Sequence, residues 1–220
     1  MKLSEMKHIE CEQNSPEWYA ARLGKVTGSR ISDVTAKGKS GQPSASRANY
    51  RAQLVAERLT GELAETFKSE AMQWGNEKEA EAAEMYEFHR NCELARCGLI
   101  IHPTIDDAGA SPDRLVGDEG LVQIKCPNTA THIATARGAS IDGCYIKQMQ
   151  WEMACTGRLW CDFVSFDPRL PADMRMIVRR IPRDSSAIIA IQAEVQGFLA
   201  EVAEEIAALI QVFRGVQEAA

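Results

Sequence analysis

The sequence of 220 residues lacks the features that mark a secreted or a membrane-spanning protein. No apolar run approaches the roughly 18 residues of a membrane span, so we expect no membrane insertion. The first residues, MKLSEMKHIECEQ, contain neither an apolar stretch nor a small-residue cleavage site, which predicts the absence of a secretory signal. The seven cysteines are odd in number and irregularly spaced, which does not indicate a disulfide framework. A reducing cytoplasm is the expected setting.

Common metal and nucleotide motifs are also missing. The cysteines form no CxxC pair, which favours idle thiols over an iron–sulfur cluster. No Walker loop occurs, so we expect no use of ATP. The four histidines show neither HxH nor HxxxH spacing, which disfavours a histidine metal site or a nucleophilic triad.

Charge is unevenly distributed along the chain. The totals are 25 Lys and Arg against 31 Asp and Glu, a formal net charge of −6. Residues 22–51 nevertheless contain seven basic residues and one acid, Asp33, whereas residues 62–93 contain nine acids and three bases. Such a chain could present a basic face to DNA. A solvated surface of mixed charge explains the same numbers equally well.

Hydrophobic periodicity and turn residues predict a mixed α/β fold. Helices are expected from Ser15 to Gly24, at about 48–60 and 70–89, around Ile146–Gly157, and at about 185–213. Strands are expected at 94–102, 109–116, 121–126, 159–166 and 174–181. No repeat and no second boundary is visible, so residues 1–220 are predicted to form a single domain ending in a long amphipathic helix.

The segment with the clearest chemistry contains Asp113, Gln123 and Lys125. Side chains alternate along a strand, so Gln123 and Lys125 share one face, and the turn at 117–120 folds that strand towards Asp113. Hydrolysis of a phosphodiester needs oxygen ligands for Mg²⁺ and a cation that stabilises developing charge. A β-hairpin with one surface aspartate is the alternative interpretation, because this short motif is weak by itself.

Six motifs occur in a characteristic order. They are Trp18-x-x-x-Arg22-Leu23-Gly24, Thr27-Gly28-Ser29, Trp74-Gly75-x-x-x-Glu79, Ser111-Pro112-Asp113, Ile124-Lys125-Cys126-Pro127 and Gln148-x-Gln150. Over about residues 15–180 the chain resembles the lambda-exonuclease-like viral recombinases, a branch of the PD-(D/E)xK nucleases. The resemblance implies a restriction-endonuclease-like core with a mixed central sheet flanked by helices.

The same resemblance implies an activity and its partners. Such enzymes degrade the 5′-ended strand of linear duplex DNA and leave a 3′ single strand for recombination. They use two Mg²⁺ ions per active site, for which Mn²⁺ can substitute. They form homotrimeric rings around DNA and act beside a single-strand annealing protein. A phage or prophage protein in the cytoplasm of a bacterial host is therefore expected.

The motifs also imply residue roles. Asp113, Gln123, Glu79 and the Ile124 carbonyl fall on metal-binding positions, and Lys125 falls on the catalytic lysine. A pocket for the 5′-terminal phosphate would be lined by Arg22, Ser29, Ser111 and Gln148, and Met72 would be an apolar wedge at the terminal base pair. Judged singly, each of these residues also fits a structural role, such as a surface arginine, a helix cap or a solvated acid.

Gln123 departs from the family pattern, which has a carboxylate there. Glutamine nearly matches glutamate in shape but lacks its charge, so we expect severely reduced hydrolysis. An inactivated variant of an active enzyme is the leading hypothesis, and a naturally degenerate copy is the alternative. Two further functions stay open: a PD-(D/E)xK endonuclease, and a non-catalytic scaffold that binds DNA ends.

Overall fold

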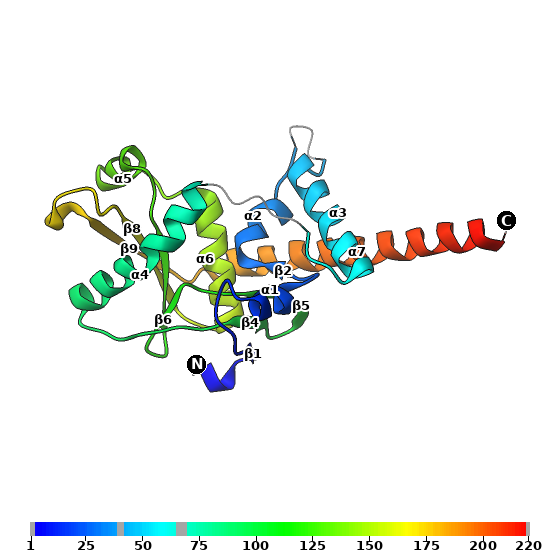
Figure 1. Cartoon of the computed structure of the whole chain (residues 1–220), viewed down its shortest axis with the longest axis horizontal. Coiled ribbons are helices and arrows are strands. Elements are labelled where there is room, and N and C mark those ends of the chain that lie inside the picture. Colours follow the sequence, from blue (N-terminus) through cyan, green and yellow to red (C-terminus); the bar gives the residue numbers. More distant parts are fainter. Residues whose placement is uncertain (1–2, 39–41, 65–69, 219–220) are drawn as a thin grey trace.

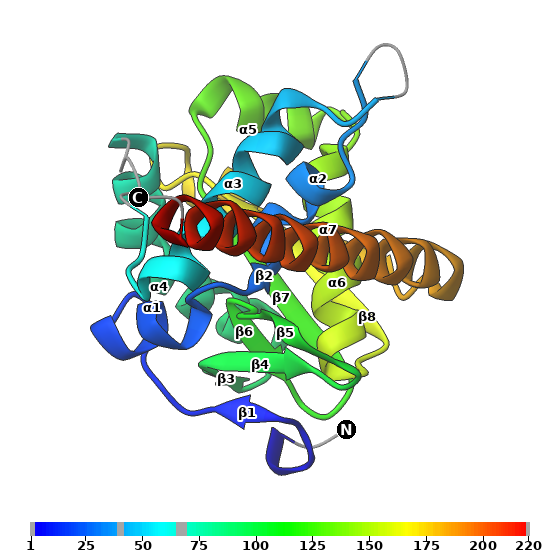
Figure 2. The same ribbon diagram turned by 90° about the vertical axis from the view of Figure 1, so that its right-hand side faces the viewer.

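The computed structural model describes residues 3–38, 42–64 and 70–218, whose strands form two sheets (Figures 1 and 2). The first sheet has the order β1 (His8–Ile9), β4 (Leu99–His102), β5 (Ile105–Ala110), β2 (Val26–Thr27). The second has the order β3 (Leu94–Ala95), β6 (Arg114–Val116), β7 (Gly120–Lys125), β8 (Trp160–Phe166), β9 (Met176–Pro182). Both sheets are mixed: β2–β5 and β7–β8 pair in parallel, and the other neighbours are antiparallel.

Helices surround these sheets. The α-helices are α1 (Pro16–Arg22), α2 (Ile31–Val34), α3 (Ala45–Thr60), α4 (Glu70–Arg90), α5 (Thr129–Ala136), α6 (Gly143–Thr156) and α7 (Ser185–Glu218). Short 3₁₀ turns lie at η1 (Leu3–Glu5), η2 (Gly28–Arg30) and η3 (Ala172–Met174). Helix α1 begins as predicted, because the Ser15 side chain accepts a hydrogen bond from the Trp18 amide and Pro16 takes the first helical position. Helices α3 and α6 end at left-handed glycines, Gly61 and Gly157.

Two predicted strands are each divided in the structure. The segment 94–102 forms β3 and β4, which belong to different sheets, and the segment 109–116 is broken by Ser111-Pro112-Asp113. Proline cannot donate to a strand ladder, so this interruption follows from the sequence. Helix α5 was not predicted; its N-cap is Asn128, whose side chain accepts a hydrogen bond from the Thr131 amide.

Strand β7 lies between two hydrophobic clusters. Val122 and Ile124 pack with Ala82 and Tyr86 of α4, as the predicted alternation requires. Leu121, on the other face, belongs to the larger cluster that α6 and α7 help to form. Strand β7 is therefore covered on both faces, and its polar residue Gln123 is buried within the fold.

Helix α7 packs its first half on the body and extends its second half beyond it (Figure 1). Phe198 stacks on Tyr50 at a ring distance of 5.5 Å, and Arg47 of α3 forms an ion pair with Glu201. Residues Ser185–Arg214 are long and apolar enough to cross a membrane, unlike the expectation from the sequence. One such helix is weak evidence for a span, because core helices of water-soluble proteins meet the same criterion.

Candidate active site and end-binding pocket

Asp113 lies in the break between β5 and β6, where it meets the neighbouring strand β7. Its Oδ2 accepts hydrogen bonds from the Ile124 amide and from the Gln123 side-chain amide, each at 2.6 Å. Burial of the carboxyl group raises the pKa of Asp113 to about 6, against the opposing effect of nearby Lys125. The structure thus brings Asp113 and Gln123 into direct contact, as the turn at 117–120 predicted.

Gln123 is 1% exposed, and both ends of its amide are engaged. Its nitrogen donates to Asp113, and its Oε1 accepts a hydrogen bond from Gln148 Nε2 at 2.9 Å. An ionised glutamate could not donate in this place and would set two carboxylates against each other. Such a pair is favourable only with a proton or a cation between them. The Gln123 amide therefore satisfies Asp113 without a cation, whereas an ionised glutamate in its place would require one.

Glu79 and Lys125 complete the predicted catalytic group. Glu79 of α4 accepts a hydrogen bond from Arg114 at 2.6 Å, and Arg114 also donates to the Asp113 carbonyl. The Lys125 ammonium lies 5.0 Å from the centre of the Tyr145 ring. Asp113, Lys125 and Glu79 all line the same cavities, so β7, the β5–β6 break and α4 converge at one place.

A cavity of about 760 Å³ joins this group to the predicted phosphate residues. Its lining includes Arg22, Ser29, Ser111 and Gln148, together with Asp113, Gln123 and Lys125. A second cavity, of about 790 Å³, meets the catalytic group from the side of α5 and the start of α6. The predicted residues are thus gathered around one continuous site, except for Met72, whose side chain lies outside the described residues.

Arg22 is half-buried and has only neutral direct partners among the described residues. Its guanidinium lies 3.8 Å above the Trp18 ring and donates to Thr27 Oγ1 at 3.2 Å. Trp18 is itself fixed by a hydrogen bond from its Nε1 to Ser111 Oγ at 2.9 Å. Burial lowers the pKa of Arg22 to about 10. A desolvated cation with no bonded carboxylate favours an anionic ligand in this cavity.

The structure adds Glu152, which sequence reasoning missed. This carboxyl is 1% exposed, and its Oε1 accepts a hydrogen bond from Gln148 Nε2 at 2.8 Å. Its Oε2 is buried without a hydrogen-bond partner among the described residues. Burial, reinforced by the charge of Asp113, raises the pKa of Glu152 to about 8. Spacing in the sequence could have indicated this residue, because Glu152 lies four positions after Gln148 and therefore on the same face of the helix.

Comparison with known proteins shows the family of the chain. A profile of the YqaJ-like viral recombinase domain matches residues 17–159. The chain is similar to an alkaline exonuclease (LHK-Exo) from Laribacter hongkongensis, with a TM-score of 0.85 and 50% identity over 92% of this chain and 100% of that one. A crystal structure of LHK-Exo in complex with dAMP matches equally well.

A more distant relative shares the fold. A phage-related exonuclease from Haemophilus somnus 129PT matches with a TM-score of 0.64 and 19% identity, over 84% of this chain and 96% of that one. Among curated proteins no match was found. The predicted PD-(D/E)xK type of fold is confirmed by the exonuclease structures. The chain belongs to the YqaJ-like viral recombinase family, and its similarity to an alkaline exonuclease shows that it is a nuclease that acts on DNA.

Proposed function

We propose that the protein is a 5′-to-3′ exonuclease of linear double-stranded DNA. It would degrade the 5′-ended strand and leave a 3′ overhang for recombination by strand annealing. The observation that carries this proposal is Arg22, a desolvated cation in the same cavity as Asp113 and Lys125. A terminal phosphate is an anion that a strand end has and the interior of a duplex lacks. The dAMP complex of the Laribacter exonuclease supports a nucleotide-sized ligand.

The proposed cofactor is a pair of Mg²⁺ ions, for which Mn²⁺ would substitute. The donors would be Asp113, Glu79, the Ile124 carbonyl and the Gln123 side-chain oxygen, which are hard oxygen atoms of the kind Mg²⁺ prefers. They fit the ion in kind but are one carboxylate short, because Gln123 is uncharged. The Gln123 amide would have to turn over to take part, because its nitrogen faces Asp113 and its oxygen accepts a hydrogen bond from Gln148. When bound, Mg²⁺ supplies charge neutralisation at the phosphate and activates water.

The protein's own residues would orient the substrate. Arg22 and Ser29 would hold the terminal phosphate, with Ser111 fixing the Trp18 platform beneath Arg22. Lys125, next to Asp113, would stabilise negative charge as it develops on the scissile phosphate. Its charge also lowers the pKa of Asp113, against the larger effect of burial, which raises it.

Restoring the carboxylate tests the proposal. Gln123→Glu is expected to raise Mg²⁺-dependent release of nucleotides from 5′-phosphorylated linear duplex by about 10²–10³-fold, the usual effect of one key electrostatic group. The assay compares both proteins on linear and on covalently closed circular DNA. Lys125→Ala in the Gln123→Glu background is the matched control and should abolish the gain. Cleavage of circles would contradict end-dependent degradation and favour an endonuclease.

A non-catalytic protein that binds DNA ends is the second candidate function. The hydrogen bond from Gln123 to Asp113 favours it, because it satisfies the site without a cation. If neither Gln123→Glu nor the parent releases nucleotides while both bind DNA ends, this scaffold function replaces the exonuclease.

The proposed assembly and location rest on the resemblance to the lambda-exonuclease-like recombinases. We propose a homotrimeric ring that encloses duplex DNA, a single-strand annealing protein as its partner, and the cytoplasm of a bacterium carrying a phage or prophage as its location. No contact with a membrane is part of this proposal.

A further inference from the structure

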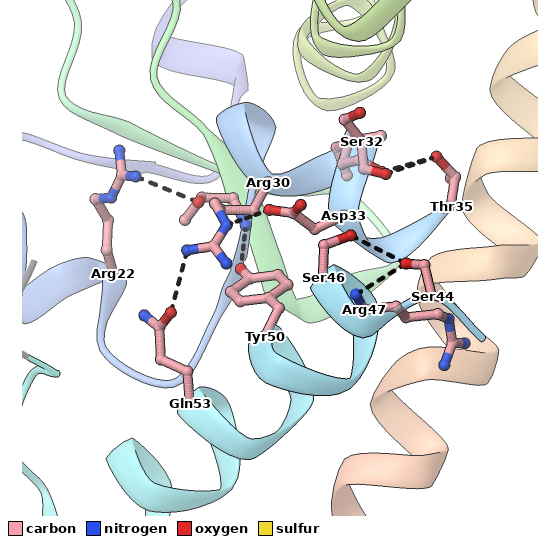
Figure 3. Close-up of polar contacts among 12 residues, drawn as sticks. Arg22, Arg30, Ser32, Asp33, Thr35, Ser44, Ser46, Arg47, Tyr50 and Gln53 are labelled. Carbon is pink, nitrogen blue, oxygen red and sulfur yellow. Dashed lines mark hydrogen bonds and ion pairs between the residues drawn. The ribbon is translucent and has the colours of Figure 1, made fainter. Parts of the chain in front are cut away.

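A second arginine, Arg30, lines the same cavity as Arg22. It comes from η2, directly after Ser29, and the resemblance to known exonucleases gives it no role. Three contacts fix its guanidinium: Nε donates to Asp33 at 2.6 Å, Nη1 donates to Gln53 at 3.1 Å, and the Tyr50 ring lies 4.0 Å away (Figure 3). Among the described residues, none is a hydrogen-bond partner of its Nη2.

The partners of Arg30 are themselves held in place. Gln53 donates to Glu57 at 2.8 Å, and the Tyr50 hydroxyl donates to the Lys25 carbonyl at 3.2 Å. The guanidinium is therefore preorganised, with one edge unused at the wall of the cavity. Preorganisation of this kind lowers the entropic cost of gripping an anion.

The two arginines are unfavourable together without an anion. Burial lowers the pKa of Arg22 to about 10, and repulsion by Arg30 adds to that effect. Glu57 opposes the shift only in part, because it bonds to Gln53 and to the Gly24 amide rather than to Arg22. Arg22 and Arg30 have one direct carboxylate partner between them, Asp33, so this pair retains positive charge for a ligand. The other charged residues that line the cavity are Lys25, Lys125, Glu57, Glu77, Glu79 and Asp113.

The two arginines indicate how much negative charge the ligand should carry. A phosphate monoester carries about −1.5 to −2 charges at pH 7, whereas a phosphodiester carries one and a hydroxyl end none. Arg22 alone balances one negative charge. We propose that Arg30 is a second cationic ligand of the 5′-terminal phosphate, and that the Arg22–Arg30 pair makes the pocket select a dianionic monoester end.

This inference rests on the proposed recognition of 5′ ends and is tested by binding, so it does not need an active enzyme. Fluorescence anisotropy with EDTA present measures Kd for three duplexes of one sequence, ending in a 5′-phosphate, a 5′-methylphosphate or a 5′-hydroxyl. The parent chain is expected to bind the 5′-phosphate about tenfold or more tightly than the hydroxyl end. The singly charged methylphosphate should fall between them.

Arg30→Gln is expected to reduce the preference for 5′-phosphate by about tenfold and leave Kd for the hydroxyl end within about twofold. Arg30→Lys should keep part of the preference, because it retains charge but lacks the planar fork of donors. Arg51→Gln is the matched control: Arg51 is 32% exposed against 33% for Arg30, but it pairs with Glu201 and Glu205 of α7 and does not line the cavity. It should leave the preference unchanged.

Different failures have different meanings. If Arg30→Gln keeps the full preference while Arg22→Gln loses it, Arg30 is a structural link between η2 and α3 and the inference is wrong. Equal weakening of phosphate and hydroxyl ends by Arg30→Gln would also overturn it. If the parent shows no preference at all, the proposed recognition of 5′ ends fails, and the inference fails with it.

Discussion

Glu152 is a single residue whose charge state depends on folding. The ordinary pKa of a glutamate is 4.5, and burial raises that of Glu152 to about 8. Between these values the folded protein holds a proton that the unfolded chain releases. The free energy of unfolding therefore falls as pH rises from about 4.5 to 8, by about 1.4 kcal/mol for each unit of pKa difference at most.

Glu152→Gln removes this titration and keeps an oxygen that can accept from Gln148. The variant is expected to match the parent in Tm near pH 4.5 and to exceed it by about 5–10 °C at pH 8. Thermal unfolding followed by circular dichroism in EDTA across this pH range measures the difference. A Tm difference that is constant with pH would show that Glu152 is ionised in the folded protein.

One of the two hydrogen bonds of the Gln123 side chain could be predicted from the sequence, and the other could not. The pattern of alternation predicted that Gln123 and Lys125 share a face near Asp113, and the hydrogen bond to Asp113 agrees. The bond from Gln148 to Gln123 was not foreseen, because it joins α6 to β7 through tertiary packing that no local spacing encodes.

Among the elements, the turn between β6 and β7 depends on one buried cation. Arg158 donates from Nη1 to the carbonyls of Val116, Gly117 and Gly120, at 3.1, 2.7 and 2.7 Å. Gly117 adopts a φ of +48°, where a side chain would be strained. This arrangement fixes the turn that returns β7, with the proposed site residues Gln123 and Lys125, towards Asp113.

Arg158→Met is therefore expected to lower the free energy of unfolding by about 3 kcal/mol, because buried carbonyls lose a charged donor. Urea unfolding monitored by tryptophan fluorescence measures the loss. Arg137→Met, at an exposed arginine, is the control and should change stability by less than about 0.5 kcal/mol. Equal stability of both variants would mean that water satisfies these carbonyls.

The order of elements was largely predictable, and their assignment to sheets was not. Caps and periodicity located α1, α3, α6 and α7 closely. The segment 94–102 read as one strand because its apolar residues are nearly continuous, yet β3 and β4 pair with partners in different sheets. Helix α5 was missed because its sequence, TATHIATA, has little apolar periodicity and depends on packing against β8.

For the whole molecule, the proposed trimer is directly measurable. Sedimentation equilibrium at micromolar concentration is expected to give about three times the chain mass of 24.3 kDa. Val212 and Phe213, exposed on the projecting end of α7, offer apolar surface that association could cover. A monomer mass over the whole concentration range would contradict the ring.

Helix α6 packs against both sheets and so connects the proposed phosphate-binding residues to the proposed catalytic residues. It packs against β4 and β5 of the first sheet and β8 of the second, and it carries Gln148 between the proposed phosphate grip and Asp113. Of the proposed phosphate residues, Ser29 directly follows β2 of the first sheet, whereas Asp113 lies in the link between β5 of the first sheet and β6 of the second. Because α6 packs against both sheets, we expect the distance between the proposed phosphate residues and Asp113 to be constant. The fragment removed at each cut would then have one fixed size, set by the backbone architecture and independent of base sequence.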